Sequence, residues 1–139
     1  MSNSPIQIQL IQPDDWHLHI RDGEVMRDVS ADTARQFARA IIMPNLKPPV
    51  TTAEMAAAYK KRILAALPVG SSFTPLMILY LTDNTSADEV KKAHQEGVAG
   101  FKLYPAGATT NSDAGVTDIK KCAKALEAME ACGMPLLIH

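Results

Sequence analysis

Short runs of continuously apolar residues alternate with helix-like segments along the chain, and this alternation constrains its fold more than any other feature. A strand that is buried on both faces is apolar throughout. Four such runs follow a shorter strand-like segment at 15–21, and they occupy residues 40–44, 73–82, 100–104 and 134–139. Strand–helix–strand units of about 30 residues join parallel strands. The sequence therefore predicts an α/β fold with a parallel sheet.

Local patterns add detail to this prediction. Residues 6–11 alternate glutamine with isoleucine and leucine, which favours a leading strand or hairpin. Two helix starts have the spacing of a capping box, in which a hydroxyl and a carboxylate bind the first free amides of the helix. These pairs are Thr51 with Glu54 and Ser86 with Glu89.

The number of strands indicates which parallel architecture to expect. Five parallel strands have two open edges, and a closed (β/α)8 TIM barrel needs about 250 residues. The chain has 139 residues and stops in a strand at His139. We therefore expect residues 1–139 to be the truncated N-terminal portion of one barrel domain, with about its first five strands. A complete doubly wound domain is the alternative, although no glycine-rich nucleotide-binding motif accompanies it.

Composition excludes several classes of function. Lys and Arg total 14 and Asp and Glu total 15, so the net charge is −1 and no basic surface for nucleic acid is expected. No apolar stretch reaches the roughly 18 residues of a membrane span. The start lacks the pattern of a secretory signal, and the two cysteines form no disulfide framework. We expect a soluble cytoplasmic protein without nucleic-acid or membrane partners.

The first strand-like segment contains the pattern H-x-H-x-R. His17, His19 and Arg21 are spaced two apart, so in a strand their side chains share one face. Two imidazoles at this spacing can bind one divalent metal ion, and an arginine beyond them can bind a carboxylate with both arms of its guanidinium. The alternative is a pair of partly exposed histidines without a ligand.

Three further polar residues lie in or just after apolar runs. Lys102 lies mid-strand, where a buried amine must be paired, neutral or chemically altered, for example as a carbamate. The alternative for Lys102 is a lysine whose amine reaches solvent at the end of the strand. His139 ends the last apolar run, and its alternative is a strand-end histidine in contact with solvent. Asn45 directly follows the run at 40–44, and its alternative is a routine turn residue. Catalytic groups of parallel barrels gather at the carboxyl ends of the strands, where these residues and the H-x-H-x-R segment all fall. We therefore expect them to form one site.

Four segments together resemble a known enzyme family. They are DDWHLHIRDG, MPNLKPPVTT, FKLYPAGATTN and PLLIH, which occur in this order between about residues 13 and 139. The chain resembles the dihydroorotase family, in its shorter bacterial and yeast type, within the metal-dependent amidohydrolase superfamily. H-x-H alone is weakly specific, whereas the four segments together are highly specific.

The resemblance implies a role for each candidate residue. His17 and His19 would bind the more buried of two zinc ions, Lys102 as N6-carboxylysine would bridge both, and His139 would bind the second. The substrate-binding residues would be His19, Arg21, Asn45, Thr109, Thr110 and His139, with the threonine pair on a mobile loop over the substrate. The family also uses a further histidine and a general-base aspartate on later strands, which this sequence does not reach.

The implied activity is interconversion of dihydroorotate and N-carbamoyl-L-aspartate in pyrimidine biosynthesis, by a protein that is expected to be a homodimer. Because the general base is absent, the 139-residue chain is expected to be inactive by itself. One alternative is a hydantoinase or dihydropyrimidinase, whose substrates lack the ring carboxylate. The other is a non-catalytic fragment that acts as a binding or assembly module.

Overall fold

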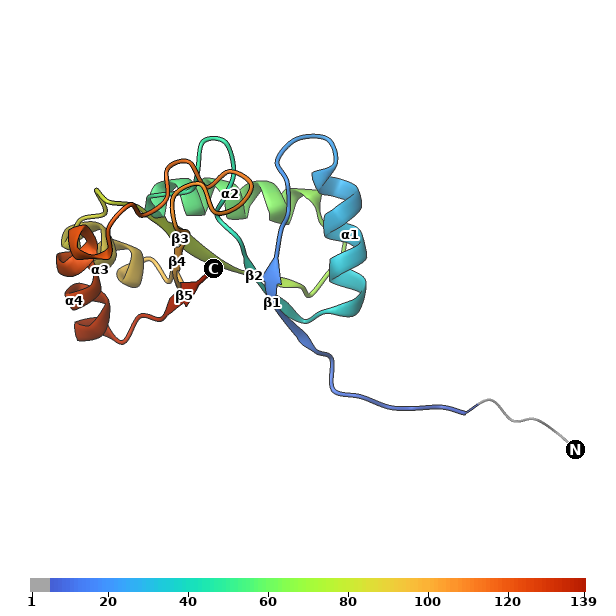
Figure 1. The fold of residues 1–139 in the computed structure, drawn as a ribbon. Helices are drawn as coiled ribbons and strands as arrows, with labels where there is room; N and C mark the ends of the chain where they lie inside the picture. The colour runs from blue at the N-terminus through green and yellow to red at the C-terminus, as the bar shows by residue number, and fades with distance from the viewer. Residues whose placement is uncertain (1–5) are drawn as a thin grey trace, which may run out of the picture.

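The apolar runs form five parallel strands in one curved sheet (Figure 1). The computed structural model describes residues 6–139. The strands are β1 (Asp14–Leu18), β2 (Arg39–Ile42), β3 (Thr74–Leu81), β4 (Gly100–Leu103) and β5 (Leu136–Ile138). They are adjacent in chain order, and each neighbouring pair is parallel. The predicted parallel α/β fold is confirmed. A doubly wound sheet would reverse its strand order part-way, and this one does not.

Four helices follow the first four strands and pack around the outside of the sheet (Figure 1). They are α1 (Met26–Gln36), α2 (Ala53–Ala66), α3 (Ala87–Gln95) and α4 (Ala123–Cys132), and the 3₁₀ turn η1 (Ile119–Cys122) precedes α4. None of these helices, the only ones between residues 6 and 139, combines the length and apolar character needed to cross a membrane.

Both capping boxes differ in detail from the prediction. The N-cap of α2 is Thr52 rather than Thr51, because the Thr52 hydroxyl accepts the amide of Met55 at 3.3 Å. The Ser86 hydroxyl caps α3 as predicted, through the amide of Glu89 at 3.1 Å. The Glu89 carboxylate does not complete a box, since Oε1 accepts the amide of Ala53 at 2.7 Å. Glu89 thus stabilises the start of α2 and links two helices that lie far apart in sequence.

The prediction of a strand or hairpin at 6–11 is wrong. The structure contains no strand between residues 6 and 13, and Ile6, Leu10 and Ile11 are more than four-fifths exposed. Alternating side chains do not make a strand unless a neighbouring strand accepts its hydrogen bonds, and no described strand pairs with this segment. Trp16, in β1, is 56% exposed, and its ring lies 5.8 Å from the guanidinium carbon of Arg39. The pairing of β1 with β2 is irregular at this point of the strand.

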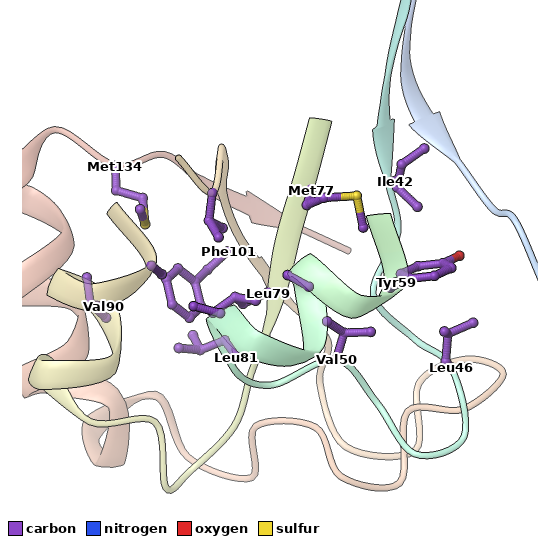
Figure 2. Close-up of a cluster of buried hydrophobic side chains, with 14 of the residues drawn as sticks. Ile42, Leu46, Val50, Tyr59, Met77, Leu79, Leu81, Val90, Phe101 and Met134 are labelled. Atoms are coloured by element: carbon purple, nitrogen blue, oxygen red, sulfur yellow. The ribbon is translucent and has the colours of Figure 1, made fainter. Parts of the chain in front are cut away.

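The sheet has two buried faces with different compositions. Figure 2 shows Leu79, Leu81 and Phe101 in the apolar cluster between the sheet and the helices, which we call the outer face. Strand residues that alternate with these are also buried but lie outside that cluster, and we call their side the inner face. Tyr80 and Lys102 are aligned on the inner face as partners in neighbouring strands β3 and β4.

Because the five strands are parallel, the segments that follow them emerge at one edge of the sheet. The segments after β1, β2 and β4 form three neighbouring loops at this edge (Figure 1). The longest is the segment between β4 and η1, which we call the β4 loop (residues 104–118). This edge is where the sequence predicts a functional site.

Candidate functional site

The two histidines at the end of β1 converge on one point. Their Nε2 atoms are 3.2 Å apart, as the two-residue spacing predicts. Burial is the main cause that lowers the pKa of His17, and the charges of Lys102 and His139 lower it further. Burial also lowers the pKa of His19, together with the charges of His17 and Arg21. These lowered pKa values favour the neutral form of both imidazoles, which has a free nitrogen lone pair.

Lys102 is buried rather than extended into solvent. Only 3% of the residue is exposed, and Nζ donates to the main-chain oxygen of Ile138 at 3.1 Å. Between residues 6 and 139, no carboxylate forms an ion pair with this amine. Burial lowers the pKa of Lys102 and so favours the neutral, nucleophilic amine. The amine lies 5.7 Å from the ring centre of Tyr104, two residues further along the same face.

His139 reaches the same region from the end of β5. Its amide donates to the main-chain oxygen of Leu103 at 3.1 Å, which continues the pairing of β5 with β4. The His139 ring lies 5.5 Å, centre to centre, from the ring of Tyr104. The charge of His139 is a smaller cause that lowers the pKa of His17, after burial and the charge of Lys102. The histidines of β1, the amine of β4 and the histidine that follows β5 thus lie at the same edge of the sheet, and Lys102 and His139 both lie near the ring of Tyr104.

Arg21 and Asn45 form a second group at the same edge. The Arg21 Nη1 donates to the main-chain oxygen of Asn45 at 3.3 Å. Asn45 is 2% exposed, and its Nδ2 donates to the main-chain oxygen of Thr110 at 3.0 Å. The Asn45 side chain raises the pKa of His19, although the effects that lower this pKa are larger. Among the described residues, no donor makes a well-aligned hydrogen bond with Asn45 Oδ1. Thr109 and Thr110 lie on the β4 loop above this group.

A metal centre can be tested against these donors. Among residues 6–139, no three His, Cys, Asp or Glu side chains are placed to share one ion. Two converging imidazoles supply two nitrogen ligands, so at least one further ligand of the ion must come from elsewhere. The buried Lys102 amine has no counter-ion and a lowered pKa, which are the conditions that favour its conversion to a carbamate. The donor set fits a metal centre that includes a modified lysine.

Some residues of this edge are absent from the sequence prediction. Tyr104 is buried with an unpartnered hydroxyl, and its ring stacks on Tyr80 at 4.9 Å between centres. Its position two residues after Lys102 could have identified it, since alternate residues of a strand share a face. Asn111 also contributes, because its Nδ2 donates to the main-chain oxygen of Asn45 at 3.0 Å. No sequence spacing connects these two asparagines.

Fold and edge geometry define a parallel α/β scaffold of the barrel type, with a polar cluster at the carboxyl ends of its strands. The chain belongs to the amidohydrolase family, whose family model matches residues 10–139. It is 68% identical over 133 residues to the dihydroorotase of Ralstonia nicotianae, across 95% of this chain and 39% of that protein. The predicted resemblance to dihydroorotases is confirmed.

Solved structures agree with this assignment. A crystal structure of dihydroorotase from Campylobacter jejuni matches with a TM-score of 0.87 and 42% identity, over 99% of this chain and 41% of that one. The dihydroorotase of Saccharomyces cerevisiae in complex with 5-fluoroorotic acid matches with a TM-score of 0.83 and 35% identity, over 91% and 35%. The curved five-stranded sheet therefore corresponds to part of a TIM barrel, as predicted. The chain spans about two-fifths of the length of the relatives it matches.

Proposed function

We propose that this chain supplies part of the active site of a zinc-dependent dihydroorotase, which interconverts dihydroorotate and N-carbamoyl-L-aspartate. One observation carries the proposal: the convergent imidazoles of His17 and His19 share an edge with a buried Lys102 that forms no ion pair among residues 6–139, in a chain 68% identical to a dihydroorotase. We propose further that residues 1–139 are the N-terminal portion of one barrel domain. The general base and one more zinc-binding histidine would then come from later strands.

Four residues of this chain would hold the metal ions. His17 and His19 would bind one zinc ion, His139 would bind the second, and Lys102 as N6-carboxylysine would bridge them. Two such ions, when bound, would supply a nucleophile at neutral pH by lowering the pKa of a water molecule. The neutral state of both imidazoles suits them to be ligands, since a protonated imidazole has no lone pair to offer.

Arg21 and Asn45 would bind the substrate carboxylate. An arginine guanidinium binds a carboxylate with two parallel hydrogen bonds, and Arg21 uses Nη1 for one long bond to a main-chain oxygen. Among residues 6–139, Arg21 forms no ion pair that would compete with a ligand. The yeast relative was solved with 5-fluoroorotic acid, a pyrimidine that has such a carboxylate. Hydantoinase substrates lack this group, so Arg21 favours dihydroorotate over the hydantoinase alternative.

Zinc content and orotate binding test the proposal on the chain as it exists. We expect zinc to bind, measured by plasma mass spectrometry after dialysis, and Lys102→Ala to lower the zinc content. Lys91→Ala, at an exposed lysine, is the matched control and should leave the zinc content unchanged. Restored zinc binding of the Lys102→Ala chain with added acetate or propionate would support the carbamate. Equal zinc content in all three chains would refute the role of Lys102.

Arg21→Met separates the substrate assignment from the metal assignment. This substitution should weaken orotate binding at least tenfold and leave zinc bound, because it removes a charge-assisted pair. Arg35→Met, at an exposed arginine on α1, is the control. Loss of zinc with Arg21→Met would show that Arg21 belongs to the metal site instead. Turnover of dihydroorotate by a longer protein, and not by this chain, would distinguish an enzyme from a non-catalytic module. The homodimer and the cytoplasmic location stay predictions.

A further inference from the structure

The β4 loop is folded on itself around one buried serine. Ser112 is fully buried, and its hydroxyl donates to the main-chain oxygen of Thr109 at 2.6 Å and accepts the amide of Thr109 at 2.9 Å. The two ends of the loop are also paired, since the amide of Val116 donates to the oxygen of Tyr104 at 2.8 Å. The loop is therefore a preformed unit whose position depends on where it is attached to the rest of the protein.

One attachment lies at the base of the loop. Asp83, just after β3, accepts the amide of Thr117 at 2.9 Å and its hydroxyl at 2.5 Å. Lys121 Nζ donates to the same carboxylate at 2.8 Å. These partners lower the pKa of Asp83, with Lys121 as the largest cause. This attachment holds the end of the loop that is remote from Thr109 and Thr110.

The other attachment lies at the tip of the loop and centres on two asparagines. Asn111 Nδ2 donates to the main-chain oxygen of Asn45 at 3.0 Å, while Asn45 Nδ2 donates back to the oxygen of Thr110 at 3.0 Å. Tyr80 Oη reaches the main-chain oxygen of Asn111 at 3.4 Å. Figure 1 shows the loop lying beside the segment that follows β2. The tip is thus held by reciprocal side-chain contacts rather than by an ion pair.

The backbone at Asn111 explains why asparagine suits this position. Its φ is +56°, and it is the one residue other than glycine with a positive φ between residues 6 and 139. Asparagine adopts this left-handed conformation more readily than most residues. It also carries the amide that reaches Asn45. Both properties are needed together, since glycine would supply the conformation without the hydrogen bond.

We infer that Asn111 is a positioning residue that attaches the tip of the β4 loop to the carboxylate-binding group. The Asn45 carbonyl that accepts from Asn111 also accepts from Arg21 Nη1 at 3.3 Å. One acceptor therefore fixes both the place of the loop and the orientation of the guanidinium. The inference rests on the proposed function for the identity of the ligand. When Asn111 no longer donates, the attachment of the loop tip to Asn45 weakens, and ligands with a ring carboxylate bind more weakly.

Hydrogen–deuterium exchange on the unliganded chain tests the attachment. Asn111→Gly keeps the backbone conformation, and Asn111→Asp keeps the shape but replaces the donating amide with a carboxylate. In both variants, the amides at 106–116 should exchange about fivefold to tenfold faster, which is the effect expected when one or two hydrogen bonds are lost. Asn84→Gly, in the loop after β3, is the control and should leave this segment unchanged. Unchanged exchange in both Asn111 variants would overturn the inference, and so would protection retained by Asn111→Asp, because that variant lacks the donating amide.

Orotate binding tests the coupling to the ligand. Both Asn111 variants should bind orotate about fivefold to tenfold more weakly by calorimetry, at unchanged zinc content. If the loop amides exchange faster in these variants but the orotate affinity is unchanged, the loop position is not coupled to ligand binding, and this part of the inference is overturned. If the unsubstituted chain binds no orotate, the substrate class in the proposed function and the coupling both fail. The exchange data from the unliganded chain still decide whether Asn111 holds the loop.

Discussion

The two faces of the sheet are both buried, yet they are built from different chemistry. On the outer face, Leu79, Leu81 and Phe101 are fully buried in an apolar cluster against the helices. The inner face buries the amine of Lys102 and the unpartnered hydroxyl of Tyr104. Apolar burial stabilises a fold, whereas burial of an unpaired polar group destabilises it. The outer face therefore provides the stability, and the composition of the inner face is explained by the site.

Phe101→Ala should produce the largest loss of stability, because it removes a large buried side chain from the apolar cluster of the outer face. Loss of a fully buried phenylalanine typically lowers the free energy of unfolding by about 3–5 kcal/mol. Chemical denaturation followed by circular dichroism measures this change. Leu64→Ala, at a half-exposed leucine on α2, is the control and should change stability by about 0.5 kcal/mol or less. Equal effects of the two substitutions would show that the cluster is not the stabilising core.

The same contrast explains which parts of the fold could be predicted. The apolar runs of β2 to β5 predict strands of a parallel sheet from sequence alone, although β5, at the edge of the sheet, is only partly buried. The segment 6–11 has an equally regular pattern and forms no strand, because a strand depends on a partner that no local pattern reveals. The capping residue of α2 was missed by one position for a related reason. Thr51 and Thr52 have the same side chain, and only the backbone path decides which one caps.

In the candidate site, the two-residue periodicity of strands identified the residues on or next to strands, but it could not identify residues on loops. The spacing of His17 and His19 predicts that their rings converge, and their Nε2 atoms are 3.2 Å apart. Lys102 is informative because an amine that is buried in an apolar strand is costly. Asn111 could not be found in this way, because its partner Asn45 is 66 positions away and the contact depends on how a long loop folds. The metal-binding and substrate-binding roles stay predictions.

Tyr59→Phe should have the next largest effect. Tyr59 is fully buried on the outer side, and its hydroxyl donates to the main-chain oxygen of Ile20, next to Arg21. Burial keeps this hydroxyl protonated by raising its pKa. Removal of the donor leaves a buried carbonyl unpaired, so the free energy of unfolding should fall by about 1–3 kcal/mol. A change below about 0.5 kcal/mol would mean that Ile20 finds another donor.

Lys102→Met tests the inner face, where we expect the substitution to leave the free energy of unfolding constant or to raise it. Methionine has a similar length and carries no charge, so the substitution removes a buried amine that lacks a counter-ion. The carbonyl of Ile138, which loses its donor, belongs to a half-exposed edge strand and can bind water. For the metal-free chain, the free energy of unfolding should stay constant or rise by about 1 kcal/mol. Lys60→Met on α2 is the control, and a loss above about 1 kcal/mol specific to Lys102 would mean that the amine stabilises the fold.

Tyr104→Phe should have the smallest effect and completes the comparison of buried tyrosines on the two faces. Tyr104 is 1% exposed, like Tyr59, and burial likewise raises the pKa of its hydroxyl. Its hydroxyl has no partner among the described residues, so deletion breaks no hydrogen bond. The free energy of unfolding should change by less than about 0.5 kcal/mol, against the larger loss for Tyr59→Phe. Denaturation curves of the two variants, measured in parallel, check this difference. Equal losses would mean that the Tyr104 hydroxyl has a hydrogen-bond partner, such as a tightly bound water molecule. The polar groups of the inner face would then have more hydrogen bonds than the side chains alone provide.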